Sequence, residues 1–240
     1  GGSELLAYIP PELLPRLAVI RQDNSVSARN SYGLDGDIRV LRLDKNQDGI
    51  VDKGDRVWLF FGMRAGGRHY YGLDVTDRSN PVLLWNIGPE TLDGVGQTWS
   101  APVIARVNVD GTPKNTDPEK FVLIFGGGYG TAQETQSYQT DTVGNRIFMV
   151  EASTGALLWS AGGTGSGADL ELAQMNNSIP SRVTVIDTNA DLFADRMYVG
   201  DMGGRLWRFD IANGNEADEL VTGGVHASLG SHDEAPPTVG

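Results

Sequence analysis

The chain of 240 residues contains no cysteine. That absence excludes a disulfide framework, thiolate catalysis and a cysteine-ligated zinc site. No apolar run is long enough to cross a bilayer, and no signal peptide is recognisable. Basic residues are scarce, because 19 lysines and arginines stand against 31 aspartates and glutamates, for a net charge of −12. An acidic surface disfavours nucleic acid and anionic membranes as partners and suits the binding of cations.

Catalytic motifs are also missing. The three histidines, His69, His226 and His232, are scattered, and no Ser/His/Asp or paired-carboxylate motif is recognisable. The glycine-rich stretches at 126–130 and 163–168 lack the βαβ context and the lysine of a phosphate-binding loop. We therefore expect a protein that is not an enzyme.

Short β-like segments between turns are abundant, and the chain has 32 glycines. They fall into three units, in which a strand pattern follows a loop and leads into a glycine-rich turn. The predicted strands are Ile38–Leu43, Val57–Phe61, His69–Val75, Val82–Ile87, Ala101–Val107, Phe121–Phe125, Arg146–Glu151, Ala156–Ser160, Arg182–Ile186, Arg196–Val199, Arg205–Ile211 and Glu219–Val221. Repeated four-stranded units predict an all-β fold, a β-propeller with up-and-down antiparallel blades.

The expected domain organisation has three blades within one propeller domain. The segments are a lead-in at 1–35, blades at about 36–90, 97–162 and 179–225, and a C-terminal loop or tail at 226–240. The pattern already loses its periodicity after Gly223, which predicts a loop there. Natural propellers have about four to eight blades, so we expect the ring to be incomplete in this chain.

Two short helices are also expected. The first covers Pro11–Ile20, with proline in its first turn and an apolar face made of Leu13, Leu14 and Leu17. The second would lie within the glycine-rich connection at 161–178.

The segment Val150–Trp159 (VEASTGALLW) resembles the A-x-D-x-x-T-G-x-x-x-W repeat of quinoprotein-type, PQQ-like propellers. Thr154 and Gly155 would form the turn between two outer strands, and Trp159 would pack between neighbouring blades. The resemblance leaves open a fragment of a PQQ-type quinoprotein dehydrogenase as an alternative function. Those enzymes use an adjacent cysteine pair against the cofactor, and this chain has no cysteine.

The strongest chemical signal is the acidic stretch Asp44–Asp55, DKNQDGIVDKGD. Its oxygen-bearing residues follow the spacing of an EF-hand-type Ca²⁺ loop, with glycine at the sixth position. The candidate ligands are Asp44, Asn46, Asp48, the carbonyl of Ile50, Asp52 and Asp55. Strand-like rather than helical segments flank the loop, so it would staple a β-hairpin. The alternative is a polar hairpin turn, since the same residue types favour turns.

A second loop, Asp187–Asp195, repeats part of this spacing. Its candidate ligands are Asp187, Asn189, Asp191, the carbonyl of Phe193 and Asp195. Leu192 stands where the first loop has glycine, and a bulky residue there predicts a strained backbone. An Asx-rich turn without metal is the alternative. The tripeptide Lys53–Asp55 also matches the integrin-type KGD sequence, which occurs often by chance.

Four stretches carry a resemblance to a known family: Ser3–Pro10, Trp58–Asp77, Val122–Gly130 and Arg196–Asp210. With them, the chain is similar to the C-terminal propeller domain of the PilY-type adhesins, called PilC in some bacteria. The resemblance implies a modified propeller with Ca²⁺ as cofactor in a nine-residue D-x-[DN]-x-D-x-x-x-D loop, which here is Asp187–Asp195. The loop at Asp44 would then be an additional site.

The resemblance also implies a role. The family are type IV pilus tip-associated biogenesis factors that balance pilus extension against retraction, with calcium occupancy as the switch. The implied partners are pilins or minor pilins and host surface receptors, and the implied location is the bacterial cell surface, at the pilus tip or outer membrane. A passive structural propeller that holds its calcium constitutively is a further alternative.

Overall fold

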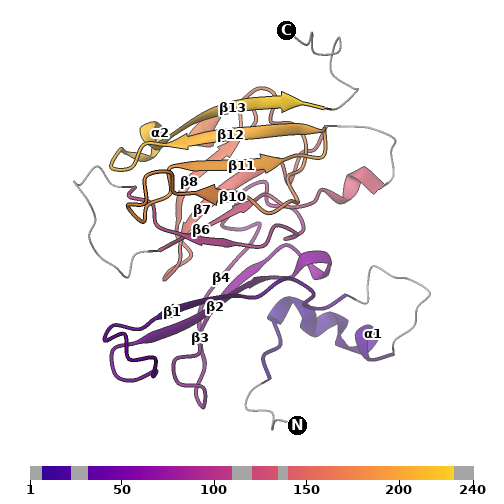
Figure 1. The fold of residues 1–240 in the computed structure, drawn as a ribbon. Coiled ribbons are helices and arrows are strands. Elements are labelled where there is room, and N and C mark those ends of the chain that lie inside the picture. Colours follow the sequence, from indigo (N-terminus) through magenta and orange to yellow (C-terminus); the bar gives the residue numbers. More distant parts are fainter. Residues whose placement is uncertain (1–6, 23–31, 110–120, 135–139, 230–240) are drawn as a thin grey trace.

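The protein is described here by a computed structural model, which covers residues 7–22, 32–109, 121–134 and 140–229. Three sheets follow one another along the chain, and all their strand pairs are antiparallel except one at the edge of the second sheet (Figure 1). The first contains β1 (Arg39–Leu43), β2 (Arg56–Gly62), β3 (Tyr70–Asp74) and β4 (Val82–Ile87). The second contains β5 (Val103–Ala105), β6 (Val122–Gly126), β7 (Arg146–Glu151), β8 (Leu157–Gly162) and β9 (Leu170–Glu171). The third contains β10 (Thr184–Ile186), β11 (Arg196–Gly200), β12 (Arg205–Ile211) and β13 (Val221–Ser228).

Burial along the strands explains why the sequence pattern located them. In β12, buried and half-buried residues alternate, as expected for a strand with one face toward the core. In β7, which lies in the middle sheet, all residues but the last are buried, because other sheets cover both of its faces. The predicted all-β propeller fold is confirmed, with strands in up-and-down order within each sheet.

Two aromatic-rich cores join the sheets. Between the first and second sheets, Phe60 stacks on Trp85, and Phe125 packs on Phe148. Between the second and third sheets, the Trp159 ring meets the Phe209 ring edge-on, with centroids 6.4 Å apart. The prediction that Trp159 packs between blades is confirmed. Each fully buried side chain of this size contributes about 1.5–3 kcal/mol, so these cores dominate the stability.

The first strands of the sheets lie side by side, since β5 contacts both β1 and β10. This is the arrangement of inner strands in neighbouring propeller blades. Within the described ranges the three sheets do not close into a ring (Figure 1).

The N-terminal helix differs from its prediction. It consists of a 3₁₀ turn, η1 (Pro11–Arg16), followed by α1 (Leu17–Gln22). Leu13 is buried against the first sheet, whereas Leu14 is 56% and Leu17 36% exposed. The predicted three-leucine face is therefore wrong, because a 3₁₀ turn has three residues per turn and separates side chains that an α-helix would align.

Two further predictions are wrong. No helix forms within 161–178, all of which is described; instead β9 pairs with β8 in parallel. The loop expected after Gly223 is the strand β13, which begins directly after the short helix α2 (Ala217–Leu220) and runs to Ser228. Strand β13 pairs with β12 through the backbone, and such pairing needs no alternation of apolar side chains. The remainder of the expected tail, 230–240, lies outside the described residues.

No helix in the described part of the chain is long and apolar enough to cross a membrane.

Candidate metal centre

The two acidic loops occupy equivalent places in their sheets. The loop Asp44–Asp55 connects β1 to β2, and the loop Asp187–Asp195 connects β10 to β11. Each closes a hairpin, in which Leu43 pairs with Arg56 and Ile186 pairs with Arg196. Both loops lie on the left of the view in Figure 1.

The backbone follows the same path in both loops. Positive φ angles occur at Gln47 (58°) and Gly49 (81°) in the first loop, and at Ala190 (62°) and Leu192 (76°) in the second. These are the fourth and sixth positions in both. Leu192 therefore adopts the left-handed conformation predicted to strain it, at a cost of about 1–2 kcal/mol.

Equivalent side chains hold the two backbones. Each loop's first aspartate accepts a hydrogen bond from the amide of the sixth residue, at 2.9 Å for Asp44 Oδ2 from Gly49 and 2.8 Å for Asp187 Oδ2 from Leu192. Asn46 and Asn189 accept through Oδ1 from the amides two residues on, at 3.3 and 2.8 Å. The aspartates at the fifth position also accept from amides two residues on, at 2.7 Å for Asp48 from Ile50 and 2.8 Å for Asp191 from Phe193. Such Asx turns are a property of Asp and Asn with or without metal.

The loops differ in how their ends are fixed. Asp55 accepts from the amide of Lys45 through Oδ1 and from the amide of Asp52 through Oδ2, both at 3.0 Å, and its side chain is buried. Asp195 accepts through Oδ2 from the amide and the hydroxyl of Thr188, both at 2.6 Å. Both aspartates stand directly before the next strand and bind the second residue of their loop. Asp55 is thus the structural counterpart of Asp195, although Asp52 is the residue that shares the ninth position with Asp195 when each loop is counted from its first aspartate.

These hydrogen bonds favour the ionised carboxylates. The amides of Asp52 and Lys45 lower the pKa of Asp55, and the hydroxyl and amide of Thr188 lower the pKa of Asp195. Because the Asp55 carboxylate is buried and bound to the backbone, the Lys53–Asp55 tripeptide does not present it to a receptor.

The first loop also offers an unused acceptor. Asp44 Oδ1 is buried and has no hydrogen-bond partner. The side-chain amide of Asn46 donates to Asp48 Oδ2 at 3.0 Å and to Asp52 Oδ2 at 3.4 Å, so these three side chains converge. Asp44 Oδ2 accepts from the Arg42 guanidinium at 3.1 Å as well as from Gly49, so Oδ1 is the oxygen of this side chain that is left for a hard cation.

Among the described residues, no three histidine, cysteine, aspartate or glutamate side chains form a ready-made metal cluster. The aspartates that begin the loops bond to backbone amides instead, and each ligand set also includes an asparagine and a main-chain carbonyl. The assignment of calcium ligands in both loops therefore stays a prediction.

Comparison with known proteins assigns the chain to a protein family. The family described as the PilY1 beta-propeller domain matches residues 9–227. The chain belongs to this family. Its relatives include the type IV pilus biogenesis factor PilY1 of Pseudomonas aeruginosa strain PAO1, 26% identical over 216 residues, and a PilY1 homolog of Xylella fastidiosa, 27% identical over 212 residues. These alignments cover 89% and 88% of this chain but only 16% and 14% of the relatives' lengths.

A solved structure supports the same assignment. The crystal structure of the Pseudomonas aeruginosa PilY1 C-terminal domain superposes with a TM-score of 0.57 at 26% identity, over 88% of this chain and 35% of that one. A europium-containing methanol dehydrogenase scores 0.34 at 17% identity, which supports no conclusion about this chain. The curated relatives are named as pilus biogenesis factors rather than as enzymes.

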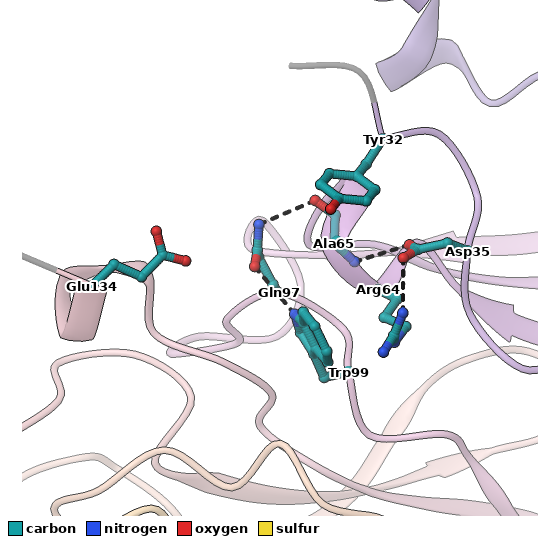
Figure 2. A pocket seen from close by; sticks show the side chains of 7 residues that line it. All are labelled: Tyr32, Asp35, Arg64, Ala65, Gln97, Trp99 and Glu134. Carbon is teal, nitrogen blue, oxygen red and sulfur yellow. Dashed lines mark hydrogen bonds and ion pairs between the residues drawn. The ribbon is translucent and has the colours of Figure 1, made fainter. Parts of the chain in front are cut away.

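This PilY1-family domain also contains pockets that sequence reasoning missed. One of about 270 Å³ is drawn in Figure 2, with Glu134 standing across an opening from Trp99 and Gln97. Arg64 binds Asp35 at 3.0 Å and lies 4.1 Å above the Trp99 ring. The Trp99 indole donates to Gln97 Oε1 at 3.2 Å. These residues are distant along the chain, so no local spacing marked them.

Proposed function

We propose that this PilY1-family domain binds Ca²⁺ in its two acidic loops, as part of a type IV pilus biogenesis factor at the bacterial cell surface. The observation that carries the proposal is the common backbone of the loops. Leu192 adopts the conformation of Gly49 despite its side chain, and equivalent acidic or amide side chains stand at the first, third and fifth positions. Strained backbone positions cluster at functional sites, so the φ angle of Leu192 supports a functional role for this loop.

In the first loop, the holders would be Asp44, Asn46, Asp48, the carbonyl of Ile50, Asp52 and Asp55, which also anchors the loop. In the second loop, the holders would be Asp187, Asn189, Asp191, the carbonyl of Phe193 and Asp195. The ion neutralises carboxylates that otherwise repel one another across the loop. Binding therefore tightens the hairpin and couples metal occupancy to the stability of the sheet.

The two loops have different roles in this proposal. The first has glycine at its sixth position and a buried anchor, so it is preorganised and stays filled. The second strains Leu192 and ends on a half-exposed anchor, so it binds more weakly and responds to changes in calcium. Occupancy of the second loop would alter the surface that meets pilins or minor pilins, and so the balance of pilus extension and retraction.

The names of the relatives, type IV pilus biogenesis factors, support the pilus role and, with it, the cell surface as the site of action. Adhesion to host surface receptors belongs to the same proposal. We expect no catalysis from this domain.

Thermal unfolding tests the calcium proposal. We expect calcium to raise the Tm relative to EDTA, because a ligand that binds only the folded state stabilises it. Asp48→Ala should remove part of that rise. Asp77→Ala is the matched control, because Asp77 also caps a turn, accepting from the amide of Ser79 at 2.9 Å, outside both loops.

Equal melting temperatures in calcium and EDTA would contradict the proposal. A titration then separates a switch from a passive structural ion. A Kd in the micromolar range permits switching, whereas a value near millimolar matches constant filling outside the cell.

A further inference from the structure

A second pocket lies beside the one in Figure 2 and shares two of its walls. It encloses about 370 Å³ and is lined by Trp99, Tyr129, Glu134, Pro180 and Met202. We call it the aromatic pocket. Trp99 and Glu134 also line the neighbouring pocket, so the two form adjoining hollows on one surface. Both volumes are in the range of ligand sites, about 300–1,000 Å³, or close to it.

The aromatic pocket lies away from the acidic loops. Its walls include the turns that follow the second strands of the second and third sheets, since Tyr129 follows β6 and Met202 follows β11. The acidic loops precede the second strands of the first and third sheets, β2 and β11. In an up-and-down sheet, successive connections lie at opposite ends of the strands. The pocket is therefore at the end of the sheets opposite to the calcium loops, and its ligand does not compete with the metal.

Backbone and side-chain contacts fix its walls. Gln97 and Tyr129 exchange two backbone hydrogen bonds, of 2.9 and 2.8 Å, which tie the chain before β5 to the turn after β6. Arg64 covers one face of Trp99 and is itself held by Asp35. The ring positions are thus set before any ligand arrives, which lowers the entropic cost of binding.

The lining has the chemistry of a cation receptor. The Trp99 and Tyr129 rings stand 6.0 Å apart at 60°, so they present faces in two directions. Aromatic faces attract cations through their quadrupole, and tryptophan does so most strongly. Glu134 adds a carboxylate to the lining. Met202, 46% exposed, supplies a flexible apolar surface that adapts to an alkyl chain.

We propose that the aromatic pocket binds a lysine or arginine side chain presented by a protein partner. The alkyl part of such a side chain would pack on Met202 and Pro180, and its charged end would meet Trp99, Tyr129 and Glu134. The net charge of −12 draws a basic segment toward the domain. Arg64 does not oppose it, because Asp35 pairs with that guanidinium at 3.0 Å.

Nuclear magnetic resonance of the ¹⁵N-labelled 240-residue chain tests this proposal. The probe is an acetylated and amidated Gly-Leu-Arg-Leu-Gly peptide, compared with the same peptide carrying neutral citrulline in place of arginine. The reporter is the Trp99 indole N–H signal, assigned by its loss in Trp99→Phe. We expect the arginine peptide to shift this signal with a Kd at least fivefold below that of the citrulline peptide.

Variants locate the effect. Glu134→Gln should weaken binding of the arginine peptide at least threefold, while Glu216→Gln, an exposed glutamate at the start of α2, should leave it unchanged. Binding should weaken with added salt and be the same in calcium and in EDTA, which separates this site from the calcium loops. Equal affinity for both peptides, or no shift with either, would overturn the proposal.

Discussion

The loops Asp44–Asp55 and Asp187–Asp195 follow one backbone path with different residues at the sixth position. Gly49 adopts its positive φ freely, and Leu192 adopts nearly the same angle against its side chain. Both are held by a first aspartate that accepts from their amide, at 2.9 and 2.8 Å. The comparison teaches that the Asx side chains dictate this conformation, and that glycine only makes it less costly.

The anchors teach a second lesson. Asp55 bonds to two backbone amides and is 1% exposed, whereas Asp195 is half-buried and bonds to the amide and the hydroxyl of Thr188. The longer loop is therefore the better fixed. Its additional residues lie between Asp52 and Asp55, where they bring the buried carboxylate to its place.

The largest effect is expected from the anchors. Asp55→Ala leaves two amides without their acceptor in a buried place, and we expect the Tm to fall by about 4–8 °C. Asp195→Ala exposes its amide partner to water, and we expect a fall of about 2 °C or less. Differential scanning calorimetry in EDTA measures both without metal. Equal decreases in Tm for the two variants would show that Asp55 and Asp195 stabilise the chain to the same extent.

Exchanging the sixth residues tests the strain next. Gly49→Leu should destabilise the chain by about 1–2 kcal/mol, because a left-handed φ is costly for any residue with a Cβ. The space around Gly49 is open, so a clash would not contribute. Leu192→Gly should stabilise by about 0.5–1 kcal/mol, since Leu192 is 69% exposed and loses little packing. Urea unfolding measures the change in the free energy of unfolding for both variants. Changes of the same sign would contradict the conclusion that glycine makes this backbone conformation less costly.

Acid should weaken both loops. The pKa values of Asp55 and Asp195 are lowered on folding, so each carboxylate contributes stability above its unfolded pKa of about 3.9. That contribution is lost as the pH falls through the lower, folded pKa. The free energy of unfolding, measured from about pH 6 to about pH 3, should fall with decreasing pH. In Asp55→Asn this dependence on pH should be weaker. An unchanged slope in Asp55→Asn would contradict the assignment.

The smallest effect concerns Thr188. Its hydroxyl donates to Asp195 at 2.6 Å, whereas Lys45, at the same position of the first loop, has no hydroxyl. Thr188→Ser keeps the hydroxyl and should be neutral, whereas Thr188→Ala should cost about 0.5–1 kcal/mol. A loss in Thr188→Ser equal to that in Thr188→Ala would point to the methyl group instead.

Much of the fold could be predicted from the sequence. Strands β4, β7 and β12 have the predicted bounds, because their apolar residues face cores on one or both sides. Strand β13 could not be predicted, since it carries two glycines and exposed residues and owes its place to pairing with β12. The register of such an outer strand is set by its neighbour rather than by its own pattern.

The candidate sites were predictable only where ligands are close in sequence. The acidic loops are local, so their spacing was visible, but the burial of Asp55 was not. The aromatic pocket combines Trp99, Tyr129 and Met202 from connections in different sheets. Only the folded arrangement brings these residues together.

Isothermal titration calorimetry with calcium tests most directly whether both loops bind the metal. The unmodified chain should bind two ions, the tighter in the first loop because Gly49 and the buried Asp55 preorganise it. Asp48→Ala should leave only the weaker ion, and Asp191→Ala only the tighter one. An unmodified chain that binds no calcium, or a tighter ion that survives Asp48→Ala, would contradict this account.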